Sequence, residues 1–265
     1  MKEISFVDTT LRDGHQSLWA TRMRTAHMLP IAPIIDEAGF MAAELMGTVH
    51  FDACLRYLRE DPWERIRLLS EAMPNTPLRA LIRGKSLTSF NIVPDAVIKL
   101  WIERCAANGI KHLMIFDALH DWSNLSKSTA IAKAVGIEVV VPLVYSLSPV
   151  HTDDFYARKT AEMIKTLNPD SVMIKDSIGL LTPERTKTLV PTIKGQIGDL
   201  PLEMHSHCTT GLAPLCCLDS VALGVDIIDT CVSPLANGPS HPSIENMIMN
   251  LRRLGYAPKA DEEAV

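Results

Sequence analysis

Two histidines separated by one residue stand in the stretch 202–208, LEMHSHC. If this stretch is a β-strand, His205 and His207 point to the same face, because side chains alternate sides along a strand. Two neighbouring imidazoles are typical ligands for a transition-metal ion. Such a pair also occurs where both histidines are solvated or hydrogen-bonded, so the metal interpretation depends on which polar residues end the other strands.

Short aliphatic runs alternate with longer segments of helical period along the whole chain. The runs predict strands at 4–8, 40–46, 78–83, 112–117, 138–145, 171–176, 202–207 and 226–232. The segments between them predict helices that include 24–38, 62–73, 94–107, 152–167 and 183–196. Several helices carry start and stop signals, such as Thr182-Pro183 at the beginning and Gly39, Gly109 or Gly136 at the end.

Eight alternating units in 265 residues predict an α/β fold, a single-domain (β/α)₈ TIM barrel over 1–265. An open, doubly wound sheet is less consistent with the sequence, since no glycine-rich phosphate loop follows the first strand. The catalytic residues of such barrels lie at the carboxyl ends of the strands. The residues that follow each predicted strand are therefore the candidates for a site.

Polar residues follow four of the predicted strands. DTTLRDGHQS comes after the first strand and contains Arg12, Asp13 and Gln16, while Arg83 ends the third, Lys175 lies at the end of the sixth and the histidine pair ends the seventh. One carboxylate with two imidazoles suits Zn²⁺ or Mn²⁺ and leaves positions for water or substrate. A lysine at the inner end of an apolar strand must be paired, desolvated or chemically altered.

Each candidate also has a structural interpretation. The alternative role of Asp13 is to cap a loop, and that of Arg83 is to pair with a neighbouring carboxylate. For His15 the structural role, orientation of a loop, is the expected one. Cys208 is expected to be a buried apolar residue rather than a nucleophile, because no neighbouring base is evident.

Composition and charge exclude several classes of function. The net charge is -5 with a pI near 6.0 and no basic run, which argues against nucleic acid as a partner. The six cysteines show no C-x-x-C spacing, so we expect reduced thiols and a cytoplasmic protein. No apolar run approaches the roughly 18 residues of a membrane helix, so no membrane insertion is expected.

Several motifs carry a resemblance to a known family: DTTLRDGHQSLWATRMRT, FDACLRYLREDPWERIRLL, MIFDALHDWSN, MIKDSIGLLTP and HSHCTTGLAPL. They closely resemble the carboxyltransferase barrel of pyruvate carboxylase, the oxaloacetate decarboxylase α subunit and transcarboxylase. That family is one of the metal-dependent barrels that include isopropylmalate synthase and hydroxymethylglutaryl-CoA lyase. The resemblance covers roughly residues 4–250.

The resemblance implies roles for individual residues. Asp13, His205 and His207 look like the metal ligands, and Lys175 looks like the lysine that becomes carbamylated and supplies a fourth, carboxylate-like ligand. Arg12, Gln16 and Arg83 look like the residues that hold a 2-oxo acid. A homo-oligomer and a partner protein that carries biotin are further implications of the family.

The expected activity is decarboxylation or carboxyl transfer on a small 2-oxo acid, of the oxaloacetate and pyruvate type, through an enolate that a divalent metal stabilises. Arg12, Asp13 and Lys175 are expected to act in catalysis. An aldolase or Claisen-type enzyme with the same enolate chemistry is one alternative. An inactive partner subunit that keeps the barrel is another.

The sequence departs from the family pattern in two places. In the loop GPSHPS, Pro239 stands where the family has a threonine that relays a proton to and from biotin, and His241 stands where the family has glutamine. The absence of the threonine hydroxyl puts dependence on biotin in doubt. We hypothesise that His241 or Ser240 protonates the enolate directly, the alternative being a loop histidine that faces solvent. The chain also ends in KADEEAV without the family's funnel domain or a Met-Lys-Met triplet, and a chain shortened after about 255 is one explanation.

Overall fold

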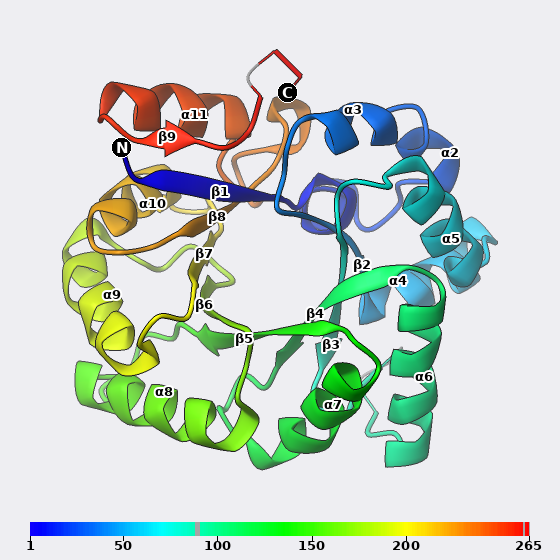
Figure 1. Ribbon diagram of the computed structural model, residues 1–265, viewed down its shortest axis with the longest axis horizontal. Helices are drawn as coiled ribbons and strands as arrows, with labels where there is room; N and C mark the ends of the chain where they lie inside the picture. The colour runs from blue at the N-terminus through cyan, green and yellow to red at the C-terminus, as the bar shows by residue number, and fades with distance from the viewer. Residues whose placement is uncertain (88–90, 262, 265) are drawn as a thin grey trace.

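The computed structural model describes residues 1–87, 91–261 and 263–264. Parallel strands follow one another around a closed barrel, in which β1 pairs with both β8 and β2 (Figure 1). These strands are β1 Glu3–Asp8, β2 Ala42–Gly47, β3 Leu78–Arg83, β4 Ile110–Phe116, β5 Glu138–Val144, β6 Ser171–Asp176, β7 Leu202–Ser206 and β8 Ile227–Thr230. The predicted barrel and all eight predicted strands are confirmed, with ends that shift by a few residues.

Helices follow the strands and surround the barrel (Figure 1). The α-helices are α1 His15–Leu18, α2 Thr25–Met28, α3 Ala32–Glu37, α4 Thr48–Ala53, α5 Pro62–Ala72, α6 Asp95–Ala107, α7 Ser123–Ala134, α8 Asp153–Leu167, α9 Pro183–Ile197, α10 Ala213–Ala222 and α11 Ile244–Arg253. Two π-helical turns, η1 Thr10–Gly14 and η2 Cys54–Leu58, and a 3₁₀ turn, η3 Ser233–Leu235, complete the set.

The predicted helix 24–38 is wrong as a single element. It consists of α2 and α3, separated by a turn at 29–31. Pro30 lies in that turn, and proline lacks the N–H that would continue the hydrogen-bond ladder. The predicted caps are correct elsewhere: the Thr182 hydroxyl accepts from the Arg185 amide at 3.2 Å at the start of α9.

The two faces of the strands have different surroundings. Val172 and Ile174 of β6 and Leu202 and Met204 of β7 belong to the large apolar cluster between the barrel and its helices. The alternate residues point inward, where a smaller cluster that includes Met173 lies. Because the period of a strand is two, the same alternation aims the catalytic candidates at the barrel axis.

The barrel interior also contains buried ion pairs. Arg79 of β3 donates to both carboxylate oxygens of Glu203 of β7, at 2.5 and 3.1 Å, and both side chains are inaccessible to solvent. Nearer the mouth, Arg12 donates from Nε and Nη2 to one oxygen of Glu44, at 2.7 and 2.5 Å. Buried charges are tolerated only when paired and hydrogen-bonded in this way.

The last residues of the chain pack beside the first. A short strand, β9 Ala257–Pro258, pairs in parallel with Glu3 and Ile4 of β1, and N and C both lie in the upper part of Figure 1. In the described part of the chain, no helix has the length and apolar character needed to cross a membrane.

Candidate active site

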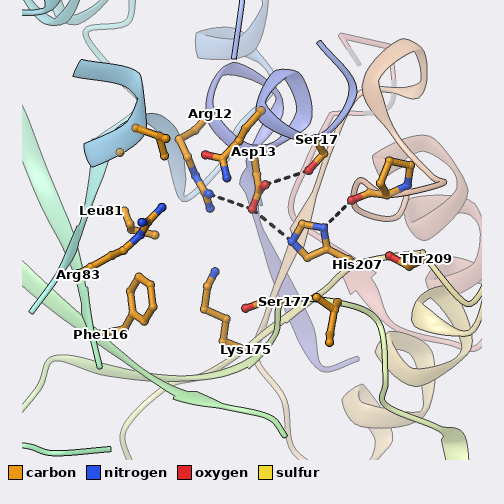
Figure 2. A pocket seen from close by; sticks show the side chains of 15 residues that line it. Arg12, Asp13, Ser17, Leu81, Arg83, Phe116, Lys175, Ser177, His207 and Thr209 are labelled. Atoms are coloured by element: carbon orange, nitrogen blue, oxygen red, sulfur yellow. Dashed lines mark hydrogen bonds and ion pairs between the residues drawn. The ribbon is translucent and has the colours of Figure 1, made fainter. Parts of the chain in front are cut away.

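A cavity of about 350 Å³ opens at the carboxyl ends of the strands (Figure 2). It brings together six of the residues that the sequence singled out, namely Arg12, Asp13, Gln16, Arg83, Lys175 and His207. Leu81, Phe116 and Val49 add apolar wall, and Ser177, Thr209 and Pro239 lie on its exposed side. Because these loops converge, residues of β3 and β6 and residues that follow β1 and β7 share one cavity.

One carboxylate oxygen lies at the centre of three imidazoles. Asp13 Oδ2 is 3.5 Å from Nε2 of His205, 3.4 Å from Nε2 of His207 and 3.1 Å from Nε2 of His241. All four side chains are buried, and their potential ligand atoms lie within 4.8 Å of one another. The sequence thus predicted three members of this group correctly as neighbours, whereas His241 was expected only as a proton donor.

Backbone carbonyls fix the orientation of two of these imidazoles. His207 Nδ1 lies 2.6 Å from the carbonyl oxygen of Pro239, and His241 Nδ1 lies 3.2 Å from that of Ser206. A carbonyl oxygen only accepts, so each Nδ1 carries the proton and donates it. The unprotonated Nε2 atoms of both rings therefore face Asp13.

His205 is oriented in the same manner by side chains. Lys175 Nζ donates to its Nε2 at 2.8 Å, which leaves the proton on Nδ1, and Nδ1 lies 2.6 Å from Asp229 Oδ2. A carboxyl group behind a histidine in this position is the usual support of a metal-binding imidazole. Asp229 was not among the predicted site residues, although an acid inside the stretch 227–230, IIDT, was a signal for it.

Electrostatics favours a cation at the centre of this group. Burial lowers the pKa of His241 to about 4 and that of His205 well below its usual range, so both rings are neutral at pH 7. Burial alone would raise the pKa of Asp13, but the Arg12 guanidinium, 2.9 Å away, holds it well below the ordinary value. The ionised Asp13 faces the lone pairs of His207 and His241, and that of His205 accepts from Lys175. A cation at the centre would therefore be stabilised by this donor set, which fits Zn²⁺ or Mn²⁺.

Lys175 lies next to both the four potential ligands and the cavity, because it contacts His205 and lines the cavity. Its side chain is buried, with 5% of the residue exposed, and burial together with nearby Arg12 lowers its pKa to about 8. The lowered pKa leaves part of the amine unprotonated near neutral pH, which is the form that reacts with CO₂. The expected desolvated lysine is thus in place, and its carbamylation stays a prediction.

The three predicted substrate-binding residues all line the cavity but differ in burial and in their partners. The Arg12 guanidinium donates to Glu44 and forms an ion pair with Asp13, so it holds the Asp13 carboxylate in position. Arg83 is half-buried, and burial and the charge of Arg12 lower its pKa from the ordinary value, although it stays positive at neutral pH. Gln16 is half-buried beside Asp13.

The alternative of a solvent-facing loop histidine is wrong for His241, which has no exposed surface. Its loop returns to the barrel through Cys208, whose amide donates to the carbonyl of Ser240 at 2.7 Å. Cys208 itself is buried, with its pKa raised to about 12, as expected of a residue that is no nucleophile. His15 is also buried and accepts from the Met23 amide at 3.4 Å, in agreement with the orienting role.

A glycine keeps the loop after β6 against the histidine pair. Gly179 has φ +70°, and a Cβ built on it would lie 2.4 Å from the carbonyl oxygen of His207. Any larger residue would displace either this loop or the end of β7, so glycine is required at this position.

Known proteins resemble this chain in sequence and fold. The profile of the HMGL-like family matches residues 112–265, more than half of the chain. The chain belongs to the HMGL-like family. Within it, the chain is 45% identical to a pyruvate carboxylase subunit of Methanocaldococcus jannaschii over 96% of its own length and 44% of that protein's. It is 33% identical to the methylmalonyl-CoA carboxyltransferase 5S subunit of Propionibacterium freudenreichii, over 98% of this chain and 52% of that one.

The structural comparison agrees with this family assignment. The carboxyl transferase domain of Rhizobium etli pyruvate carboxylase, solved with pyruvate, superposes with a TM-score of 0.91 at 32% identity, over 95% of this chain and 43% of that one. The predicted resemblance to carboxyltransferase barrels is therefore confirmed. This HMGL-like chain spans about half the length of the curated relatives named above.

Proposed function

We propose that the barrel catalyses decarboxylation or carboxyl transfer on a small 2-oxo acid of the oxaloacetate and pyruvate type. One observation carries the proposal: Asp13 and His207 of the Asp13–histidine group line the same cavity of about 350 Å³ as Arg83. That volume suits a small molecule. The likeness to carboxylases and carboxyltransferases supports the choice of reaction.

A divalent cation, Zn²⁺ or Mn²⁺, is part of the proposal. Asp13, His205 and His207 would hold it, and Lys175 would add an oxygen ligand once carbamylated. A cation bound there supplies a Lewis acid that polarises the ketone of the substrate.

The chain's own residues have separate tasks in this proposal. Arg83 pairs with the substrate carboxylate in a bidentate manner, and Gln16 donates an amide hydrogen to the ketone oxygen as negative charge develops on it. Leu81 and Phe116 form the apolar wall that excludes water from the reacting carbons. Arg12 holds Asp13 ionised and in place.

Three further expectations from the sequence stand as proposals. His241 or Ser240 would return a proton to the enolate carbon, because Pro239 has no hydroxyl to do so. Carboxyl transfer to or from biotin on a separate carrier protein would be slow, because Pro239 cannot relay the proton that this exchange needs. The cysteine pattern supports a cytoplasmic location, and the family resemblance supports a homo-oligomer, which sedimentation at micromolar concentration would test.

The test of the function is pyruvate formation from oxaloacetate, followed with a coupled dehydrogenase assay and corrected for the rate that free metal gives. We expect turnover that requires Zn²⁺ or Mn²⁺, and a loss of about 10³-fold in kcat/KM in Arg83→Gln, equal to about 4 kcal/mol. The exposed Arg158→Gln on α8 is the matched control. Turnover that is equal in both variants would contradict the assignment, and an aldehyde-dependent condensation would favour the aldolase alternative.

A further inference from the structure

His241 has the geometry of a ligand. Its Nε2 is 3.1 Å from Asp13 Oδ2, and the other two Nε2 atoms are 3.4 and 3.5 Å from that oxygen. In a tetrahedral zinc site with bonds of about 2.0–2.1 Å, adjacent ligand atoms lie about 3.3 Å apart. The three distances match this spacing, although His241 was not predicted to hold a cation.

The orientation of His241 is fixed for this purpose. Its Nδ1 donates to the Ser206 carbonyl on the strand that also carries His205, and its ring centroid lies 4.2 Å from that of His205. Its Nε2 is buried and has no hydrogen-bond partner among the described residues. A buried, unpartnered imidazole nitrogen costs free energy unless something occupies its lone pair.

Lys175 differs from this set in chemistry and not in position. Its Nζ lies 2.8 Å from Nε2 of His205, but the protonated amine offers no lone pair to a cation, whereas Asp13 Oδ2 faces all three imidazoles. The four unmodified side chains therefore supply one anionic and three neutral ligand atoms, enough for a complete tetrahedral site. A carbamate on Lys175 would add to such a site instead of completing it.

We propose that His241 is a fourth side-chain ligand, so that the protein binds its divalent cation without carbamylation of Lys175. This deepens the proposed function, because it concerns the same cation. It also gives this chain a ligand at the position where the resemblance placed a glutamine. Proton return to the enolate would then fall to another group, such as Ser240 or water.

The experiment measures binding of Zn²⁺ to chelator-treated protein by competition with a chromophoric chelator, in CO₂-free buffer and again with bicarbonate. We expect His241→Gln to weaken binding at least tenfold, and Lys175→Met to change it by less than about threefold. Bicarbonate is expected to have no effect on the wild type. The exposed His27→Gln is the matched control for the histidine change.

A second measurement keeps the proposal testable if a variant is poorly folded. Co²⁺ bound to the wild-type protein in CO₂-free buffer should give the intense visible bands of a four-coordinate site with nitrogen ligands, unchanged when bicarbonate is added. Weak six-coordinate bands, or bands that form only with bicarbonate, would overturn the proposal. So would a Lys175→Met protein that no longer binds zinc, or a His241→Gln protein that binds it as the wild type does.

These outcomes are separable from the proposed function. Normal affinity in His241→Gln together with slowed turnover would instead support His241 as the proton donor. Tight binding by four side chains in a protein that releases no pyruvate from oxaloacetate would leave this inference standing and remove the carboxyl-transfer assignment.

Discussion

On β7, Leu202 and Met204 pack against the helices, while Glu203 and His205 face the inside of the barrel. All four are completely buried, so burial alone does not distinguish the two faces. Apolar contacts stabilise the outer face, and they tolerate small shifts of the side chains. Directed hydrogen bonds and ion pairs stabilise the inner face, and they are lost when the side chains shift. The outer face therefore maintains the barrel, and the inner face sets the site.

The largest expected effect is the loss of one inner charge. Glu203→Gln removes the nearer counter-ion of buried Arg79 and leaves Glu44 at 4.0 Å, and we expect the free energy of unfolding to fall by about 3 kcal/mol or more. Urea unfolding followed by circular dichroism measures it. The exposed Glu138→Gln on β5 is the control, and an equal, small effect in both variants would erase the proposed contrast between the faces.

A cavity on the outer face should cost somewhat less and leave the site intact. Leu113→Ala removes a fully buried side chain of β4 from the outer cluster, and we expect a loss of about 3 kcal/mol in unfolding free energy. Zinc affinity at 25 °C should stay within a factor of two. Leu100→Ala on α6, which is 54% exposed, is the control, and weakened zinc binding in the Leu113 variant would show that the faces are coupled.

The inner face should also make stability depend on pH. Burial raises the pKa of Asp8 to about 7 from the ordinary 3.8, so the folded state binds the proton more tightly than the unfolded state. The contribution of Asp8 is then complete below about pH 3.8 and is lost as pH rises through about 7. Between pH 5 and 7 the wild type should lose about 2 kcal/mol relative to Asp8→Asn.

The control for this pH effect is the exposed Asp199→Asn, measured by the same urea titrations at both values. It should follow the wild type at pH 5 and at pH 7. Parallel curves for the wild type and Asp8→Asn would show that Asp8 ionises in the folded protein as freely as in the unfolded chain.

The smallest expected effect concerns the loop after β8. Pro239→Thr introduces a hydroxyl on the cavity wall and keeps the carbonyl that accepts from His207. If the absent hydroxyl limits proton exchange with biotin, free biotin should accelerate CO₂ release from oxaloacetate about tenfold more in the variant than in the wild type. Equal stimulation in the two proteins would remove the relay as the reason for weak biotin coupling.

The sequence predicted the outer face well, because hydrophobic period and strand length follow directly from the order of residues. It missed the break at Pro30, where a local breaker outweighed an otherwise helical period. Asp13, His205 and His207 were predictable as neighbours since they lie at or shortly after the carboxyl ends of strands, and these ends converge in a barrel.

His241 was not predictable as a member of that group. It lies in an irregular loop, whose path depends on hydrogen bonds from Cys208 to Ser240 and from His241 to Ser206. Such loop contacts leave no period in the sequence. Glu44 and Asp229 did leave a trace, each as a single acid within an apolar strand, and such residues merit attention in other barrels.

The most direct test of the account is anomalous diffraction from a crystal grown with Mn²⁺ and pyruvate. We predict one anomalous peak among Asp13 Oδ2 and the Nε2 atoms of His205, His207 and His241, with the pyruvate carboxylate on Arg83. A peak elsewhere, or no peak at this position at saturating Mn²⁺, would contradict the central claim that this mouth of the barrel is a cation site for a 2-oxo acid.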